Sequence, residues 1–150
     1  MKIGIASDHG GFEIKQIIKK RLEKLNYDVV DFGNTRNDPQ DDYPDFVIPL
    51  AKAVAKKQVE KGIAICGSGV GASIAANKIH GARAALVHDH FAAHQGVEDD
   101  DMNILCMGGR IIGSEKANEL VTAFLNAKFS NAERHRRRLL KVEPPNSIYY

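Results

Sequence analysis

The decapeptide AICGSGVGAS at residues 64–73 combines one cysteine with three glycines at alternate positions. Glycines at this spacing let a loop approach an anion closely, as phosphate-binding loops do. Cys66 ends a predicted strand where a helix begins, and free backbone N–H groups there can lower a thiol pKa. A thiolate beside such amides can remove a proton from carbon while the amides stabilise the oxyanion. The decapeptide therefore fits proton abstraction next to a carbonyl.

Two other interpretations of this loop stay open. The stretch GSGVGA (67–72) fits a dinucleotide fingerprint, with Asp89 as the acid for a ribose. Against this, the motif follows the third strand, and no second domain is available to hold a hydride acceptor. In the other interpretation the glycines only form a tight turn and Cys66 is a small buried side chain, as we expect for Cys106.

Apolar strand-like runs alternate with amphipathic helices around this loop. Strands are predicted over 2–7, 28–33, 62–66, 83–88 and 103–108, and helices over 12–26, 44–61, 71–79, 91–98 and 115–127. Pro44 and Pro49 confine the secure part of the second helix to its later residues. The pattern predicts one domain over 1–150, a Rossmann-like three-layer α/β/α sandwich with a mostly parallel five-stranded sheet.

Sheets of this class bind ligands beyond the carboxyl ends of their strands. Those ends carry polar or glycine-rich segments at 7–9, 33–34, 66–68, 88–90 and 108–110. His9 and His88 belong to two of these segments, so a Cys–His pair with Cys66 is an open alternative.

The composition of the 150 residues is that of an ordinary globular protein, with 43% hydrophobic and 27% charged residues. No apolar run approaches the roughly 20 residues of a membrane span, and the N-terminus carries no export signal. Two cysteines without a disulfide framework indicate reduced thiols and a cytoplasmic location. The net charge is +2, and residues 134–141 hold five basic side chains. This segment indicates a local anion site or a solvated helix end, not a nucleic-acid surface.

Five segments together identify a resemblance: SDHGGF (7–12), DYPDF (42–46), ICGSGVGASIAANK (65–78), MGGRIIG (107–113) and the Arg-His pair at 134–135. In this order, and over nearly the whole chain, they resemble the ribose-5-phosphate isomerase B family, which includes the galactose-6-phosphate isomerase subunits. The resemblance implies aldose–ketose isomerisation of a phosphorylated sugar through an enediolate, without metal or cofactor. It also implies a homodimer, or a tetramer, with the site between subunits.

The resemblance assigns roles to individual residues. Cys66 is the base that moves a proton between C1 and C2, and Ser68 hydrogen-bonds the thiolate or the substrate. Other members use a glutamate at the position of Ala72, so the alanine leaves Cys66 as the base. The expected oxyanion amides and sugar and phosphate contacts are, in chain order, Asp8, His9, Tyr43, Gly67, Gly69, Val70, Gly71, Asn77, Arg110, Arg134 and Arg138.

Two of the phosphate arginines can be tested against helical spacing. Arg134 and Arg138 are four residues apart, so they share one face if their segment is helical. Arginine grips phosphate with a forked, charge-assisted contact, which supports the assignment. Arg136 and Arg137 then point elsewhere, into solvent. The basic segment and tail, 132–150, are expected to close the site or to pack on the partner subunit.

The chain departs from the family in GVEDDDMN (96–103). Asp99 stands where the family has a ring-opening histidine, Asp100 stands where it has an asparagine, and Asn103 is kept as a substrate contact. A carboxyl group has an ordinary pKa of about 3.9, so it donates a proton at neutral pH only if burial or neighbouring acids raise that pKa. The four acids could instead form an exposed turn.

Three hypotheses follow from this departure. Another histidine, among His88, His90 and His94, could open the ring; the spacing of the last two would also suit a metal ion. Alternatively no ring needs opening, because a tetrose 4-phosphate has no free hydroxyl with which to close a furanose. Finally, the chain could be a sensor that binds a nucleotide or a sugar phosphate without turnover.

Overall fold

The computed structural model describes residues 1–143, so the expectation for the tail at 144–150 falls outside the described part. Five strands form one sheet in the order β2-β1-β3-β5-β4. They are β1 (Lys2–Ser7), β2 (Asp28–Asp31), β3 (Lys61–Cys66), β4 (Ala84–Leu86) and β5 (Ile104–Gly108). Every pairing is parallel, so all five carboxyl ends meet at one edge of the sheet.

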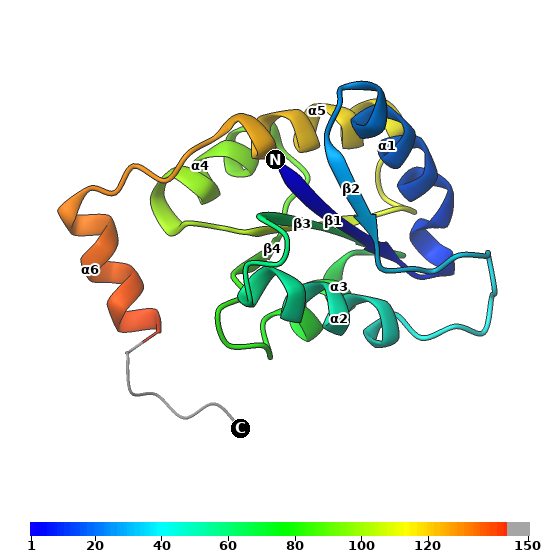
Figure 1. Ribbon diagram of the computed structural model, residues 1–150, viewed down its shortest axis with the longest axis horizontal. Helices are drawn as coiled ribbons and strands as arrows, with labels where there is room; N and C mark the ends of the chain where they lie inside the picture. The colour runs from blue at the N-terminus through cyan, green and yellow to red at the C-terminus, as the bar shows by residue number, and fades with distance from the viewer. Residues whose placement is uncertain (144–150) are drawn as a thin grey trace.

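Helices cover both faces of the sheet, as Figure 1 shows. They are η1 (His9–Gly11), α1 (Phe12–Lys24), α2 (Pro44–Ala55), α3 (Val70–Ala76), α4 (His90–Asp100), α5 (Ser114–Asn126) and α6 (Glu133–Val142). Side chains of α1, α4 and α5 join one core cluster, and those of α2 and α3 join the other. The predicted α/β/α sandwich is therefore confirmed, with a sheet that is parallel throughout.

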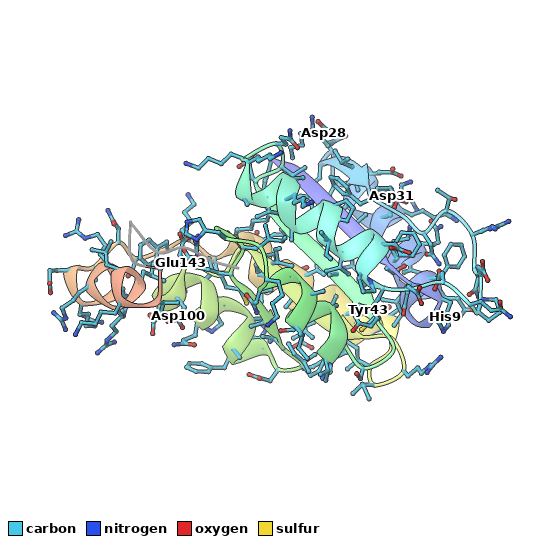
Figure 2. All side chains as sticks on the ribbon, turned by 90° about the horizontal axis from the view of Figure 1, so that it is seen from below. His9, Asp28, Asp31, Tyr43, Asp100 and Glu143 are labelled. Atoms are coloured by element: carbon cyan, nitrogen blue, oxygen red, sulfur yellow. The ribbon has the colours of Figure 1, made fainter. Side chains whose placement is uncertain are left out.

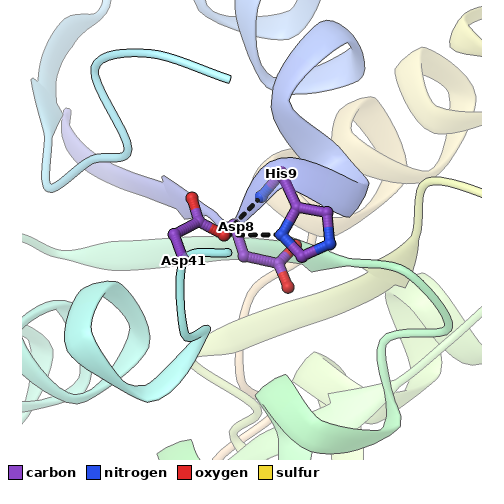
Figure 3. A group of neighbouring side chains, drawn as sticks. All are labelled: Asp8, His9 and Asp41. Atoms are coloured by element: carbon purple, nitrogen blue, oxygen red, sulfur yellow. Dashed lines mark hydrogen bonds and ion pairs between the residues drawn. The ribbon is translucent and has the colours of Figure 1, made fainter. Parts of the chain in front are cut away.

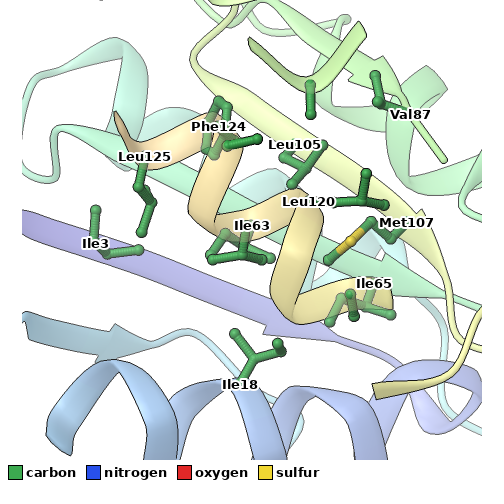
Figure 4. Close-up of a cluster of buried hydrophobic side chains, with 14 of the residues drawn as sticks. Ile3, Ile18, Ile63, Ile65, Val87, Leu105, Met107, Leu120, Phe124 and Leu125 are labelled. Atoms are coloured by element: carbon green, nitrogen blue, oxygen red, sulfur yellow. The ribbon is translucent and has the colours of Figure 1, made fainter. Parts of the chain in front are cut away.

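The two faces of the sheet carry side chains of different size. Large residues of β1, β3 and β5 point toward α1 and α5, and Figure 4 shows them against Leu120 and Phe124 of α5. The other face carries small residues, among them Ala6, Ala64 and Cys66. Small side chains let α2 and α3 approach the sheet closely, which brings the loop before α3 over the end of β3.

The second helix begins at its predicted first residue and ends earlier than its predicted last residue, 61. It begins at Pro44, which occupies the first helical turn without cost, and it continues through Pro49 as far as Ala55. Pro49 removes the N–H that the Asp45 carbonyl would accept, but both residues are exposed, so water can replace that bond. The buried Leu50 holds the helix on the sheet across this point.

The last helix stands apart from the sandwich. Figure 1 shows α6 beyond the far end of α4, reached by an extended segment after α5. Arg134 and Arg138 share one face only if their segment is helical, and the structure confirms that it is a helix. Among the helices of residues 1–143, none combines the length and the apolar character needed to cross a bilayer.

Candidate active site

Cys66 is the last residue of β3, and its side chain is 4% exposed. Its Sγ accepts a hydrogen bond from the Gly69 N–H at 3.2 Å. Gly69 has a φ of 83°, a left-handed conformation that favours glycine and turns this N–H back toward the sulfur. Because α3 is only seven residues long, this amide, not a long helix dipole, is the backbone group that acts on the sulfur.

The thiol opens into a hollow of about 370 Å³ at the carboxyl edge of the sheet. We call it the Cys66 hollow; its lining residues are Asp8, Tyr43, Cys66, Gly67, Ser68, Gly71, Arg110 and Ile111. The resemblance assigns a role to seven of these eight residues, and the eighth, Ile111, belongs to the MGGRIIG motif. The position of this hollow also agrees with the rule that parallel sheets bind ligands beyond the carboxyl ends of their strands.

Two side chains from other loops close on the glycine loop. The Tyr43 ring packs on Gly71 so closely that a Cβ there would lie 2.5 Å from its Cζ. The Arg110 N–H donates to the Gly67 carbonyl at 3.0 Å, and its guanidinium lies over the same residue. Arg110 thus brings a permanent positive charge to the hollow, next to loop amides, where an anionic substrate would meet both.

Asp8 is buried at the floor of the hollow, with 7% of its surface exposed. It caps η1 by accepting a hydrogen bond from the Gly10 N–H at 2.9 Å. Burial raises the pKa of Asp8 and outweighs both this bond and the attraction of His9. A buried carboxyl group of this kind can exchange a hydrogen bond with a sugar hydroxyl in either protonation state.

His9 is held by a chain of side chains that runs from Ser7, the last residue of β1, through Asn34 and Asp41 of the loop between β2 and α2. Figure 3 shows the contact between Asp41 and His9. Its Nδ1 lies 2.6 Å from Asp41 Oδ1, and the same oxygen accepts its backbone N–H at 3.0 Å. Asn34 Nδ2 donates to the other oxygen of Asp41 at 2.6 Å, and the Ser7 hydroxyl donates to Asn34 Oδ1 at 3.2 Å. The imidazole is therefore oriented by groups far away in the sequence.

The other histidines take structural or surface positions. His88 Nε2 accepts the Gly108 N–H at 3.0 Å, and no hydrogen bond joins it or His9 to Cys66 within residues 1–143. His90 pairs with a glutamate of α5 at 3.4 Å, and His94 pairs with one of α4 at 3.3 Å. These two line a separate, larger hollow between α4 and α5, which lacks the amides of the glycine loop. The His90–His94 metal hypothesis finds no third ligand in the described part of the chain.

The structure separates the expected site residues into two groups. One surrounds the Cys66 hollow, and the other comprises Asp99, Asp100, Arg134 and Arg138 on α4 and α6. Figure 2 shows Asp100 at the opposite end of the molecule from His9 and Tyr43. A single chain therefore does not bring the two groups together.

Asp99 forms contacts with two other side chains, whereas the sequence did not decide between a buried position and an exposed turn. Gln95 Nε2 donates to its Oδ2 at 2.7 Å, and His135 Nε2 lies 3.4 Å from its Oδ1. The side chain is 36% exposed, so it is neither deeply buried nor part of a free acidic turn. It ties α4 to α6. Arg134 and Arg138 on α6 are exposed, as are Arg136 and Arg137.

Asn77 and Asn103 do not line the Cys66 hollow of their own chain, and their expected role as substrate contacts stays a prediction. Asn77 ends α3, and its amide exchanges two hydrogen bonds with Ala84 at the start of β4. Asn103 precedes β5 and holds the Arg83 N–H and the Gly81 carbonyl. Both lie at the amino edge of the sheet, because α3 runs back from the carboxyl edge.

Asp89, the proposed ribose ligand in the dinucleotide interpretation, has a structural role in this fold. It is the N-cap of α4, where its Oδ1 accepts the Ala92 N–H at 2.8 Å. Sequence reasoning missed Asp41, which stands beside the DYPDF motif. Asp41 and Asp42 are adjacent, and the sequence does not indicate which of them turns toward the interior.

Comparison with known proteins gives a consistent picture. The model of the family described as Ribose/Galactose Isomerase matches residues 3–142. A Bacillus subtilis protein named as a sugar phosphate isomerase, without a specified sugar, is 43% identical over 142 residues, covering 95% of each chain. Ribose-5-phosphate isomerase B of Clostridium thermocellum has a TM-score of 0.92 at 44% identity, with 95% of each chain covered. The Mycoplasma genitalium enzyme of that name, solved with bound ribulose-5-phosphate, has a TM-score of 0.90 at 41% identity, covering 94% of this chain and 93% of that one.

Proposed function

Because this chain belongs to the Ribose/Galactose Isomerase family, we propose that it interconverts ribose 5-phosphate and ribulose 5-phosphate with Cys66 as the base. Its class is that of its relatives, the aldose–ketose isomerases of sugar phosphates. The observation that carries the proposal is the Cys66 thiol at the Cys66 hollow, within 3.2 Å of the Gly69 amide. The bound ribulose-5-phosphate of the M. genitalium relative supports the choice of sugar.

The proposed step moves one proton between neighbouring carbons. The Cys66 thiolate takes the proton from C2 of the open-chain aldose, and the C2–H electron pair forms the C1=C2 bond of an enediolate. The carbonyl pair moves to O1, and in this proposal backbone N–H groups of Gly67, Gly69, Val70 and Gly71 stabilise the oxyanion. Before substrate binds, the N–H groups of Gly69 and Val70 donate to Cys66 Sγ and Ser68 Oγ. Return of the proton to C1, with transfer of the O2 proton to O1, gives the ketose. Ala72 is fully buried and cannot act as a base, which leaves this role to Cys66.

The phosphate contacts require two chains in this proposal. Arg110 belongs to the Cys66 hollow, whereas Arg134 and Arg138 are exposed on α6, which Figure 1 shows apart from the sheet. We therefore propose a homodimer in which α6 of one subunit reaches the Cys66 hollow of the other. A band of exposed apolar side chains at the hollow and on the neighbouring elements supports this contact: Val70, Ile74, Leu86, Phe91 and Ile111.

Subunit mixing tests the shared site. Cys66→Ala protein and Arg134→Ala/Arg138→Ala protein are mixed under conditions that allow subunit exchange. If each site combines Cys66 of one subunit with Arg134 and Arg138 of the other, each mixed dimer regains one intact site. Activity should then return to about a quarter of that of wild type at full exchange. A mixture as inactive as its parents would contradict the shared site.

A second substrate remains a candidate because of Asp99. With Gln95 and His135 on its two oxygens, this residue is placed as a structural tie, so the family's ring-opening histidine has no direct counterpart here. A tetrose 4-phosphate would need no ring opening. Both sugars would use the same Cys66 and loop amides.

A turnover panel separates these possibilities. Ribose 5-phosphate, allose 6-phosphate, galactose 6-phosphate and erythrose 4-phosphate are each assayed with wild type and Cys66→Ala. We expect ribose 5-phosphate to lead and the variant to lose about 100-fold or more. If erythrose 4-phosphate is turned over fastest, the substrate assignment changes, while Cys66 remains the proposed base. Binding without turnover of any sugar would favour the sensor hypothesis. We also propose a cytoplasmic location, which the two unpaired thiols support.

A further inference from the structure

The contact between Asp41 and His9 is more specific than a surface ion pair. One carboxylate oxygen, Oδ1, lies 2.6 Å from Nδ1 of the ring and 3.0 Å from the backbone N–H of the same residue. The carboxylate thereby fixes both the position and the rotation of the imidazole. With Nδ1 directed at Asp41, the Nε2 atom points away from it, as Figure 3 shows.

Asp41 is itself held in place. Its side chain is only 9% exposed, and its second oxygen accepts Asn34 Nδ2 at 2.6 Å. Burial alone would raise the pKa of Asp41, but the hydrogen bonds from His9 and Asn34 outweigh burial and keep that pKa below its ordinary value. The group facing Nδ1 is therefore a carboxylate, an acceptor only.

A carboxylate on Nδ1 determines what Nε2 can do. Nδ1 keeps its proton as the donor to Asp41, so in the neutral ring the lone pair lies on Nε2, which is ready to accept a proton. When Nε2 is protonated, the negative charge of Asp41 stabilises the resulting imidazolium. This arrangement makes an imidazole a better general acid–base group, and it is the arrangement that orients the histidine of a hydrolytic triad.

The residues on both sides of His9 in the chain lie at the Cys66 hollow or against its glycine loop. Asp8, its neighbour in the chain, lines the hollow, and Gly10, on its other side, is in contact with the Gly67 backbone. The His9 side chain is 26% exposed, so solvent or a ligand can reach it. Asp99, by comparison, has both oxygens engaged, by Gln95 and His135. Its neighbour Asp100 lies at the opposite end of the molecule from His9, as Figure 2 shows.

We propose that His9 is the acid–base residue that opens the furanose ring of the substrate in this protein, and that Asp41 is its positioning residue. Nε2 takes the proton from the anomeric hydroxyl. The O1–H pair becomes the second C1–O1 bond, the C1–O4 bond breaks, and its electron pair stays on O4. Nε2 then returns the proton to O4, so that one proton has moved from O1 to O4. The open aldehyde is the form on which Cys66 acts. This proposal rests on the proposed pentose phosphate substrate.

Ring opening can be measured without isomerisation. The Cys66→Ala variant lacks the base for carbon, so any remaining catalysis on ribose 5-phosphate is ring opening and closing. Magnetisation transfer between the α and β anomers of ribose 5-phosphate gives the rate of this interconversion by NMR. We expect Cys66→Ala to accelerate it above the rate in buffer, and Cys66→Ala/Asp41→Asn to lose that acceleration.

A matched control lies on the same loop. Asp38 has a partly exposed side chain that accepts the Gln40 N–H, and Asp38→Asn makes the same chemical change as Asp41→Asn. Cys66→Ala/Asp38→Asn should keep the acceleration. In the chain with Cys66 intact, Asp41→Asn should lower net conversion of ribose 5-phosphate by about 10- to 100-fold, and Asp41→Glu should restore part of it.

Two results would overturn the proposal. One is unchanged anomer interconversion in Cys66→Ala/Asp41→Asn, or no acceleration by Cys66→Ala itself. The other is loss of the acceleration on Asp99→Asn in the same background while Asp41→Asn keeps it. Failure of the substrate assignment gives a different result, namely no net conversion of ribose 5-phosphate by the wild type.

Discussion

His135 Nε2 lies 3.4 Å from Asp99 Oδ1, and this contact joins α6 to the last turn of α4. The other ring nitrogen, Nδ1, lies 2.6 Å from the Ser130 hydroxyl, in the segment that leads into α6. The imidazole is 4% exposed and is thus enclosed between two polar partners. This buried histidine is therefore one of the contacts that orient the basic helix, together with the ion pair between Arg83 and Glu143 at its end.

The first prediction concerns this link. His135→Ala leaves Asp99 and Ser130 without their common partner, so we expect a loss of about 1–3 kcal/mol in the free energy of unfolding. If α6 carries phosphate-binding arginines, KM for the sugar phosphate should rise more than kcat falls. Urea denaturation and steady-state kinetics measure the two effects. Arg136→Ala on the same helix is the control, and an unchanged KM in His135→Ala would contradict the link between α6 and phosphate.

The second prediction separates the two thiols. Cys106 lies in β5 and is fully buried, and burial, followed by the nearby Cys66, raises its pKa strongly. Cys106→Ala should therefore keep kcat within about threefold and cost about 1 kcal/mol of stability, the cost of a small cavity. Cys66→Ala should show the opposite pattern, with kcat lost and stability retained. Equal losses of kcat in both variants would argue against a unique cysteine base.

The third prediction uses the close approach of Tyr43 to Gly71. A methyl group on Gly71 would lie 2.5 Å from Tyr43 Cζ, so Gly71→Ala must displace the ring and reduce kcat/KM. In Tyr43→Ala the space is free, and adding Gly71→Ala should cost little more. The coupling between the two substitutions should therefore be strong. Additive effects on kcat/KM in this double-mutant cycle would show that the ring does not close the loop.

The fourth prediction is a pH dependence that originates at Lys61. Its Nζ donates to the carbonyls of Phe124 and Ala127 at the end of α5. Burial lowers its pKa from 10.5 to about 8, against the attraction of Asp101 and Glu60. Between about pH 8 and pH 10.5 the unfolded chain binds a proton that the folded chain lacks, so this lysine makes stability rise with pH.

Lys61→Met measures that contribution. Urea denaturation of both proteins at pH 7.5, 9 and 10 gives the difference in unfolding free energy between wild type and variant. This difference should move in favour of the wild type as the pH rises, because the desolvation penalty of the charged amine disappears. A difference that is constant over this range would show that Lys61 keeps its ordinary pKa in the folded protein.

Most of the fold could be predicted because its signals are local. The five strands and the helices between them follow from the spacing of apolar residues; the clearest differences are in the second helix, which continues through Pro49 and ends at Ala55 before its predicted end at 61. The continuation arises because the buried Leu50 outweighs the local preference of an exposed proline. Tertiary packing thus determines that the helix continues through Pro49, and the local sequence pattern alone does not predict this.

The site was predictable only where it follows a strand. Cys66, Asp8 and Arg110 stand directly after carboxyl ends, so the strand rule placed them together. Asp41 belongs to a loop without periodicity, and its partner His9 is 32 residues away. The position of Asn77 also follows from geometry, since a helix that starts at the carboxyl edge runs back toward the amino edge, where Asn77 contacts Ala84.

The chain of hydrogen bonds from Ser7 through Asn34 and Asp41 to His9 also bears on how this loop can change in evolution. It fixes the loop at its two ends, Asn34 and Asp41, while most of the residues between them are exposed. Insertions or deletions within 35–40 would therefore be absorbed by solvent-facing turns without moving the imidazole. In homologous chains we expect length variation to concentrate there, and a shift by a single residue at Asn34 or Asp41 to be selected against.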